Sequence, residues 1–444
     1  MLKQLSVIFL FAVTEVSEIT AQQAWSLDQC IGYAVEQSPG VQKQMVQKRI
    51  YDQYYKESVA SLFPSVSAGT SLSTSFGRSI NPATNTYENT SNLNNPYQLS
   101  ASLPLFDGLS SWYNIRFREA GKERGLKEIE RVKDQLALDV MQAYYDGVYY
   151  MKLVQLAEEQ LVQSRQELTF TTKKEELGLT AGADIAQMEA KVAADSFNLV
   201  RQENYQHLSI IRLKELMNYP MDSALEIDTM LADFIPQTSI NNLEEIKETA
   251  LSTLPEAEQS KLLIKEAKLQ HKMAQGSLFP YISLSGGIST NYYENLNDNA
   301  ADKRSFSSQF KNNRGEYVTI NLSFPLFNKL SNISRIKRSK YQYTISKLDH
   351  QATINKLEKD IEQAAADLAG TGKEYIQAQK QAYALQLAHR VNRRKYEEGL
   401  ISVIELQTSS NQYLQAEADL VASRIRYLLK DKLVNYYRGI PLIP

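Results

Sequence analysis

The 444-residue chain has a single cysteine, Cys30, which excludes an internal disulfide and a thiolate cluster. Its four histidines are isolated and lack the spacing of a metal site: His207, His271, His350 and His389. Lys and Arg total 49 against 51 Asp and Glu, so there is no broad basic surface for nucleic acid. There is no G-x-S-x-G elbow, and AGTGKE at 369–374 departs from a phosphate loop at two essential positions. We therefore predict no catalysis, no cofactor and no metal.

Long hydrophobic runs are also scarce. LSVIFLFAV at 5–13 follows Lys3 and precedes small Ala21, a pattern typical of a signal peptide, here 1–21. No later stretch approaches the ~18 consecutive apolar residues of a transmembrane helix. An exported chain of this kind is either soluble outside the inner membrane or crosses a membrane by strands.

The chain contains a duplication. SLFP occurs at 61–64 and again 216 residues later at 277–280. PLF at 104–106 recurs 221 residues later at 325–327. Other landmarks keep the same order and spacing. They predict two repeats, 22–241 and 242–444, each with the order helix–strand–strand–helix–turn–helix.

Each repeat has two segments in which apolar residues alternate with small polar ones, the period of a strand. We place them at about 65–77, 96–106, 281–292 and 316–327. Their length suits a tilted crossing of a bilayer. Eight apolar residues are predicted to face lipid: Val66, Leu72, Leu99, Leu103, Ile282, Leu284, Ile320 and Leu322. The edge of a soluble β-sandwich is the alternative, but the long polar connections at 77–95 and 291–316 favour outer-membrane strands.

Four strands cannot close a barrel. An open edge in lipid leaves backbone groups unpaired at several kcal/mol each, and single-chain barrels have at least about eight strands. The chain is therefore expected to share its strands in an obligate oligomer.

The remainder is predicted to be helical. Proline is absent from about 109–176 and about 331–398, and each run would form a helix of about 100 Å. Both show coiled-coil spacing: Leu136, Val140, Ala143, Gly147 and Tyr150, and Leu357, Ile361, Ala364 and Leu368. Shorter helices are predicted at about 26–60, 183–217, 242–275 and 402–437. An ordinary helical bundle is the alternative, but these lengths exceed a compact domain.

Proline after SLF ends a helix at the membrane surface, and Asp107 and Asn328 are predicted to cap the helices that follow the strands. With this plan and the turns GLTAGAD and GLISVIE, the chain resembles the TolC-like outer-membrane efflux protein family over about 22–444. The resemblance implies a mostly α fold with a β-barrel portion, in a homotrimer that shares a twelve-stranded barrel. It implies the outer membrane of a Gram-negative bacterium, with lipid around the barrel and antiparallel coiled-coil helices that form a periplasmic tunnel.

The same resemblance implies partners at the far tips of the tunnel, namely a periplasmic adaptor (membrane fusion) protein and an inner-membrane transporter. The implied function is export of small toxic molecules such as drugs. Export of proteins is an alternative within the family. A structural or adhesive envelope fibre is an alternative of another class, although a fibre has no need of membrane-length strands.

The helix turns are the candidate site. Gly178 and Gly399 follow long charged helices, as C-terminal capping glycines do. With Asp184 they shape tips at which Leu179, Leu400 and Val403 are expected to be exposed and to dock the adaptor.

One acidic residue is a candidate for the tunnel entrance. Asp184 and Glu405 begin the returning helices, where acids suit the positive helix end. The family resemblance implies two acids three residues apart at the entrance, but Thr408 occupies the second position here. Glu405 alone is therefore predicted to form a ring, held by charge pairing to three cations: Arg393, Arg394 and Lys395.

Overall fold

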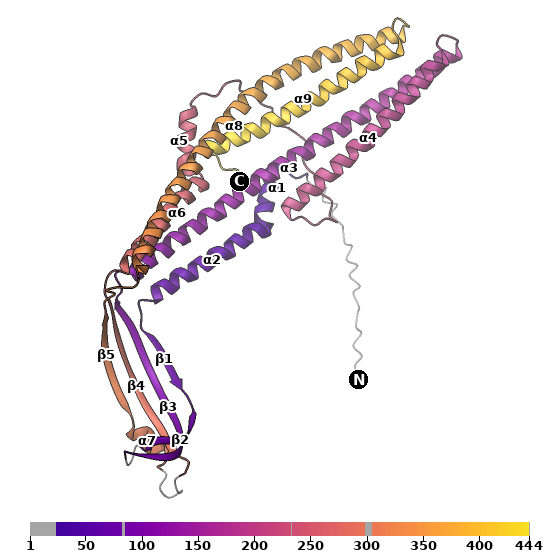
Figure 1. Cartoon of the computed structure of the whole chain (residues 1–444). Helices are drawn as coiled ribbons and strands as arrows, with labels where there is room; N and C mark the ends of the chain where they lie inside the picture. The colour runs from indigo at the N-terminus through magenta and orange to yellow at the C-terminus, as the bar shows by residue number, and fades with distance from the viewer. Residues whose placement is uncertain (1–23, 82–84, 232, 298–303, 444) are drawn as a thin grey trace, which may run out of the picture.

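The computed structural model describes residues 24–81, 85–231, 233–297 and 304–443, so the predicted signal peptide lies outside the described residues. The strands occupy one end of an elongated molecule and two helical hairpins reach to the other end (Figure 1). Within these ranges, no helix combines the length and the hydropathy needed to cross a membrane.

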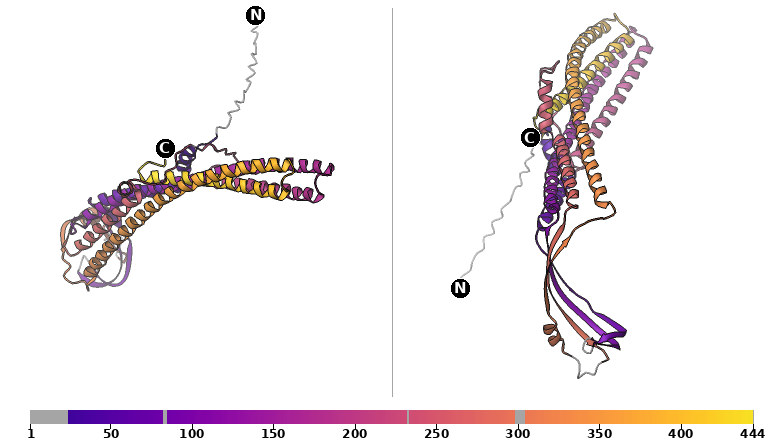
Figure 2. Two further views of the ribbon diagram at one scale, coloured as in Figure 1. Left: turned by 90° about the horizontal axis from the view of Figure 1, so that it is seen from above. Right: turned by 60° about the vertical axis from the view of Figure 1, so that its left-hand side comes forward.

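Two helices of 67 residues dominate the chain. They are α3 (Ser110–Glu176) and α8 (Ser331–Glu397), each about 100 Å long at 1.5 Å per residue. The returning helices α4 (Gly182–Met217) and α9 (Val403–Tyr437) pack along them, as the right-hand view of Figure 2 shows. Both long helices have the limits expected from the proline-free runs.

Each of the helices predicted at 26–60 and 242–275 is broken in two. The pieces are α1 (Leu27–Gln37), α2 (Pro39–Ala60), α5 (Leu243–Thr253) and α6 (Pro255–Gly276). Proline disfavours helix in the residue before it. Ser38 and Leu254 accordingly adopt extended ψ angles of 120° and 132°, and Pro39 and Pro255 each begin a new helix.

The strands form one antiparallel sheet with the order β1-β3-β4-β5, in which β2 also pairs with β3. Their limits are β1 (Ser65–Thr70), β2 (Ser73–Asn81), β3 (Thr86–Phe106), β4 (Tyr281–Asn295) and β5 (Gly315–Ser323). β1 and β2 follow one another along the side of β3 away from β4, so the sheet is four strands wide.

The strand limits correct the prediction. The strand expected over 65–77 is interrupted at Ser71 and Leu72, so Leu72 lies between two strands. The segment 77–95, expected as a loop, is mostly strand, with pairing that continues to Asn81 and Thr86. β5 ends at Ser323, four residues earlier than expected. In the extended hairpin Arg78, Asn89 and Ser91 interrupt the face that carries Phe76, Ile80, Tyr87 and Leu93, so the alternation that marks a half-buried strand is broken.

A short helix, α7 (Phe306–Asn312), lies between β4 and β5 and was not predicted. It is fastened to β4 by Gln309, whose side chain accepts from the Tyr293 N–H at 3.0 Å and donates to the Tyr293 carbonyl at 2.8 Å.

The predicted caps act from outside the N-cap position. Leu109 and Leu330 are the N-cap residues, both left-handed, with φ of 64° and 62°. Two residues earlier, the Asp107 carboxylate accepts hydrogen bonds from the N–H and hydroxyl of Ser111 at 2.7 and 2.6 Å. The side chain still satisfies a free N–H of the first turn.

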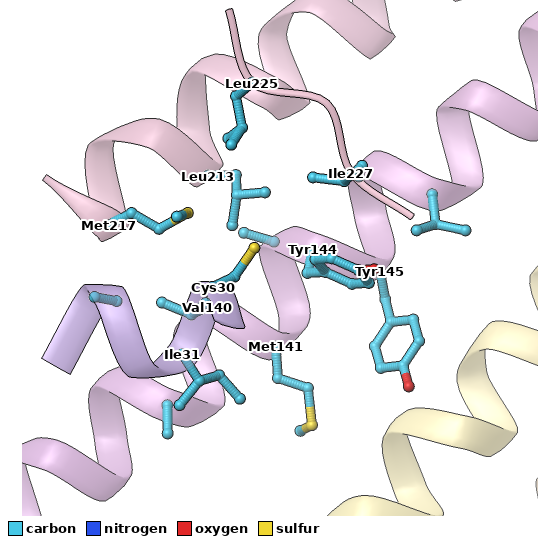
Figure 3. Packing of buried hydrophobic residues seen from close by; sticks show 14 of the residues in the cluster. Cys30, Ile31, Val140, Met141, Tyr144, Tyr145, Leu213, Met217, Leu225 and Ile227 are labelled. Atoms are coloured by element: carbon cyan, nitrogen blue, oxygen red, sulfur yellow. The ribbon is translucent and has the colours of Figure 1, made fainter. Parts of the chain in front are cut away.

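Buried apolar side chains join α1, α3 and α4 (Figure 3). Cys30 is fully buried among them, near Leu213 and Met217. Burial raises the pKa of its thiol to about 12, so it is unreactive at neutral pH. Val140 of the first coiled-coil stripe lies in this cluster, and Ile361 of the second stripe lies in the matching cluster of α5, α6, α8 and α9.

AGTGKE lies inside α8, and one of its glycines has a packing role. A Cβ atom on Gly372 would lie 2.3 Å from the carbonyl oxygen of Gln237, in the segment that connects the repeats. The N–H of Gln237 donates to the Tyr427 hydroxyl at 2.9 Å, which holds that segment against α9. Gly370, two residues earlier, has no atom within 4 Å of such a Cβ.

Candidate functional site

The tips of both hairpins are glycine-capped turns. Gly178 and Gly399 have φ of 71° and 77°, the left-handed region that favours glycine. In each turn the next N–H reaches back to the long helix: Leu179 donates to Lys174 O, and Leu400 to Lys395 O, both at 2.8 Å. This geometry leaves the side chains of Leu179 and Leu400 70% and 67% exposed.

Val403, the third residue expected to be exposed, is buried, which corrects the prediction. It is 3% exposed and packs with Met188 of α4, Tyr396 of α8 and Leu406 of α9. As the first residue of α9 it faces the other hairpin, because its exposed neighbour Ile404 takes the outward position. Val403 therefore helps to join the two hairpins near their tips.

The two acidic residues have different roles, because no side chain caps α4 whereas Glu405 caps α9. The Asp184 carboxylate, in the first turn of α4, accepts a hydrogen bond from the Thr180 hydroxyl of the preceding turn. Glu405 forms a capping box with Ser402: its side chain accepts from Ser402 N–H at 3.0 Å, and its own N–H donates to the Ser402 hydroxyl at 3.3 Å.

The expected charge pairing of Glu405 is wrong in this chain. Arg393 lies nearest to Glu397, at 3.6 Å, and the Glu405 carboxylate is held by Ser402 instead. Among the residues that the structure describes, no ion pair joins Glu405 to Arg393, Arg394 or Lys395. A carboxylate one turn into a helix satisfies the nearest free N–H more easily than it reaches the neighbouring helix.

A set of contacts that the sequence reasoning missed joins the hairpins, and we call them the inter-hairpin polar contacts. The Tyr396 hydroxyl of α8 lies 2.6 Å from the Thr171 hydroxyl of α3, and Lys174 donates to the Tyr396 carbonyl at 2.8 Å. Further from the tip, Gln160 of α3 donates to the Ser410 hydroxyl of α9 at 3.1 Å.

A signal for these contacts exists in the sequence. The coiled-coil spacing of α3 continues past Tyr150 as Ala157, Ser164, Glu167 and Thr171, all buried. The last three are polar, so core positions of a coiled coil are occupied by groups that need hydrogen-bond partners. The hairpin interface thus changes from apolar near its middle to mixed near the tips, where these polar residues lie beside the small apolar cluster of Met188, Val403 and Leu406.

His389 belongs to this interface. Its Nε2 atom lies 2.8 Å from Gln163 Nε2, which also donates to the Glu167 carboxylate at 2.9 Å. Burial, together with the charges of Arg393 and Lys191, lowers the pKa of His389, and burial raises the pKa of Glu167. His389 is therefore neutral at neutral pH and accepts from Gln163. In the described ranges, no three His, Cys, Asp or Glu side chains could hold a metal ion together.

The sheet has one apolar face. Directly paired residues of an antiparallel sheet point to the same side. The register places Leu103 opposite Leu284 and Leu284 opposite Ile320, and it pairs Ile282 with Leu322. Val66 and Leu99 have the same parity on this face. Small polar residues such as Ser285 and Thr319 occupy the other face.

This architecture is similar to that of known proteins. A family model described as "Outer membrane efflux protein" matches residues 30–219 and 248–431. The chain is 23% identical to outer membrane protein TolC of Salmonella enteritidis over 431 residues, which is 95% of this chain and 83% of that protein.

Solved structures show the same fold. The Campylobacter jejuni CmeC outer membrane channel aligns with a TM-score of 0.79 at 15% identity, over 93% of this chain and 85% of that one. The outer membrane protein VceC from Vibrio cholerae also aligns with a TM-score of 0.79, at 13% identity, over 93% of this chain and 96% of that one.

Proposed function

The chain belongs to the outer membrane efflux protein family, and from this premise we propose that three copies form a duct that exports small toxic molecules with a periplasmic adaptor and an inner-membrane pump. As a family member it is an outer-membrane efflux channel and not an enzyme. This sets the envelope-fibre alternative aside. The exported substrates and the partners are the parts that are proposed.

The observation that carries the proposal is the pair of open edges on the sheet. β1 and β5 form the two edges, and every residue of both strands is exposed in the single chain. Open edges cannot persist in lipid, because their N–H and C=O groups have no water to bond. Pairing of β5 with the β1–β2 edge of the next copy satisfies both edges, and three sheets of four strands give about twelve strands, within the range of membrane barrels.

The exposed apolar face then becomes the lipid-facing surface. Val66, Ile320 and Leu322 are 66%, 68% and 69% exposed in the single chain, which is costly in water and favourable in hydrocarbon. The polar face turns inward and lines a wet lumen. We keep Leu72, an exposed residue between β1 and β2, among the proposed lipid-facing residues.

At the far end, we assign adaptor docking to Leu179 and Leu400. Two exposed leucines on rigid, glycine-capped turns present small apolar knobs that a partner can bury. Gly178, Gly399 and Asp184 hold the turns in shape. Val403 is not part of this surface, because it is buried between the hairpins.

We still propose Glu405 as a residue of the tunnel entrance, but without the charge pairing that the sequence predicted. Its carboxylate is exposed although it caps α9, so three copies on a symmetry axis would present a ring of negative charge. Such a ring attracts cations and opposes anions.

The test combines assembly with transport. The purified chain should migrate as a trimer and open conducting channels in planar bilayers. Deletion of its gene should raise cellular accumulation of a small fluorescent dye and leave secreted proteins unchanged. A monomer without conductance would overturn the duct. Unchanged dye accumulation with loss of a secreted protein would replace small-molecule export with protein export.

A further inference from the structure

Positive charge is concentrated where the helices meet the sheet. The first 18 residues of α8, Ser331–Leu348, contain five cations and no acid: Arg335, Lys337, Arg338, Lys340 and Lys347. The facing end of α6, from Ala267 to Gly276, has Lys268 and Lys272 and also lacks acids. The ion pairs of α8 begin only at Lys356, which pairs with Glu256 at 3.1 Å.

A cavity of about 560 Å³ lies within this basic region, between α6, α8 and the start of α3. Arg335 and Arg338, one helical turn apart, lie on the wall that α8 provides. The polar lining is completed by hydroxyl and amide side chains, and the apolar part by Met273 and Ala274. Arg335 donates one weak hydrogen bond, to the side-chain Oδ1 of Asn332 at 3.3 Å, so most guanidinium donors of the pair face the open space.

The cavity lies at the level of a membrane surface. Arg335 and Arg338 are four and seven residues beyond the first residue of α8, or about 6 and 10 Å along the helix axis. Beside this level the two SLFP motifs expose Phe63 and Phe279, by 69% and 56%, and Phe327 is 79% exposed. Aromatic side chains of this kind favour the boundary between hydrocarbon and headgroups.

We propose that this cavity binds the anionic headgroup of a phospholipid from the leaflet around the junction of sheet and helices. The guanidinium groups of Arg335 and Arg338 bind the phosphate oxygens, for which their planar fork is suited. The hydroxyls of Ser110 and Ser339 supply further donors at the cavity wall, and Met273 offers an apolar surface to the glycerol backbone. The inference rests on the proposed placement of the sheet in the membrane.

The first repeat shows which residues can replace the two arginines without disturbing the helix. Residues 221 positions earlier than Arg335 and Arg338 are Asn114 and Phe117, so the first repeat builds the same part of its long helix without these arginines. Arg335→Asn with Arg338→Phe therefore removes both charges. The control, Lys337→Gln with Lys340→Gln, removes the same charge from exposed positions about 200° around the helix.

The experiment measures lipid retention by the full chain. The protein is reconstituted in nanodiscs of phosphatidylglycerol and phosphatidylcholine in equal amounts, and lipids that remain bound are counted by native mass spectrometry. We expect retained phosphatidylglycerol and little phosphatidylcholine. The double arginine variant should lower phosphatidylglycerol affinity about 20- to 30-fold, since each such charge contributes ~1 kcal/mol at a membrane surface. The lysine control should lose at most about threefold, and Arg335→Lys with Arg338→Lys should retain part of the binding.

Two results would overturn the proposal. They are equal retention of the two lipids, and equal losses of phosphatidylglycerol in the arginine and lysine variants. Channel conductance of the same wild-type sample separates these failures from failure of the duct itself, because a conducting protein that retains no lipid refutes only the lipid site.

Discussion

Replacement of Tyr396 by Phe isolates one hydrogen bond between the two hairpins. The Tyr396 hydroxyl lies 2.6 Å from the Thr171 hydroxyl, and both side chains are buried. The ring is unchanged by the substitution, so its packing against Val403 and Met188 remains. Lys174 also keeps its bond, because it donates to the backbone carbonyl of Tyr396.

The free energy lost in Tyr396→Phe depends on which buried polar groups keep a hydrogen-bond partner. Thr171 still donates to the Glu167 carbonyl at 2.8 Å, so no buried polar atom is orphaned. The net loss is then that of one ordinary hydrogen bond, ~1 kcal/mol. If the tips separate one protomer at a time, the open population rises about fivefold. If three protomers open together, the loss is ~3 kcal/mol and the rise is about 150-fold.

Single-channel recording in planar bilayers measures the open fraction. The matched control is Tyr413→Phe, which removes a 3.5 Å contact with Gln386 inside the α8–α9 hairpin and should leave the open fraction unchanged. Thr171→Val should open the channel at least as much as Tyr396→Phe, because it leaves the buried Tyr396 hydroxyl without this partner, and the double variant should not exceed Thr171→Val. We expect the Tyr396–Thr171 contact to hold the tips closed. An open fraction that does not respond to Tyr396→Phe, or that responds equally to Tyr413→Phe, would refute this role.

Four further changes test other parts of the molecule. Leu179→Asp with Leu400→Asp should abolish dye export but leave a membrane-inserted trimer, whereas loss of the trimer would make both leucines structural. Ile320→Arg, at the middle of β5 on the apolar face, should cost ~2–4 kcal/mol, and Thr319→Arg much less. Equal trimer yields from these two variants would contradict the face assignment. Glu405→Gln preserves the capping box and removes the charge, so weaker cation preference is expected, and unchanged ion selectivity would leave Glu405 as a cap only. Gly370→Ala should raise or maintain the temperature of trimer dissociation, whereas Gly372→Ala should lower it, because its Cβ meets the Gln237 carbonyl; equal shifts would contradict that contact.

The long helices could be predicted because their signals are local. Absence of proline over 67 residues and the 4-3 spacing of residues such as Ile361 and Leu368 each depend on the helix alone, and both residues are buried as the spacing requires. The ends of the strands could not be predicted in the same way. In the β2–β3 hairpin, beyond the proposed lipid-facing residues, the strands pair through backbone hydrogen bonds. Backbone pairing requires no particular side-chain polarity and therefore leaves no pattern in the sequence.

The tip residues show a second limit of the sequence. Leu179, Leu400 and Val403 are all apolar residues next to a turn, yet only the first two are exposed. Burial of Val403 depends on Tyr396 of the same hairpin and on Met188 of α4, which approaches Val403 only when the two hairpins pack together. A turn motif therefore predicts the conformation of its backbone, whereas burial of its side chains is decided by the partner helix.

The composition of the hairpin interface bears on how the tips can move. Near the middle of the chain, Val140 and Leu368 lie in apolar clusters that stabilise by area and have no directional contact to break. Near the tips, Thr171 and Tyr396 meet through a hydrogen bond, and water can replace such a partner when the helices separate. Apart from the small apolar cluster around Val403, separation of these polar contacts thus costs less than separation of an apolar seam of equal length. The same chain can therefore keep a rigid middle section and an end that an adaptor docked at Leu179 and Leu400 could open.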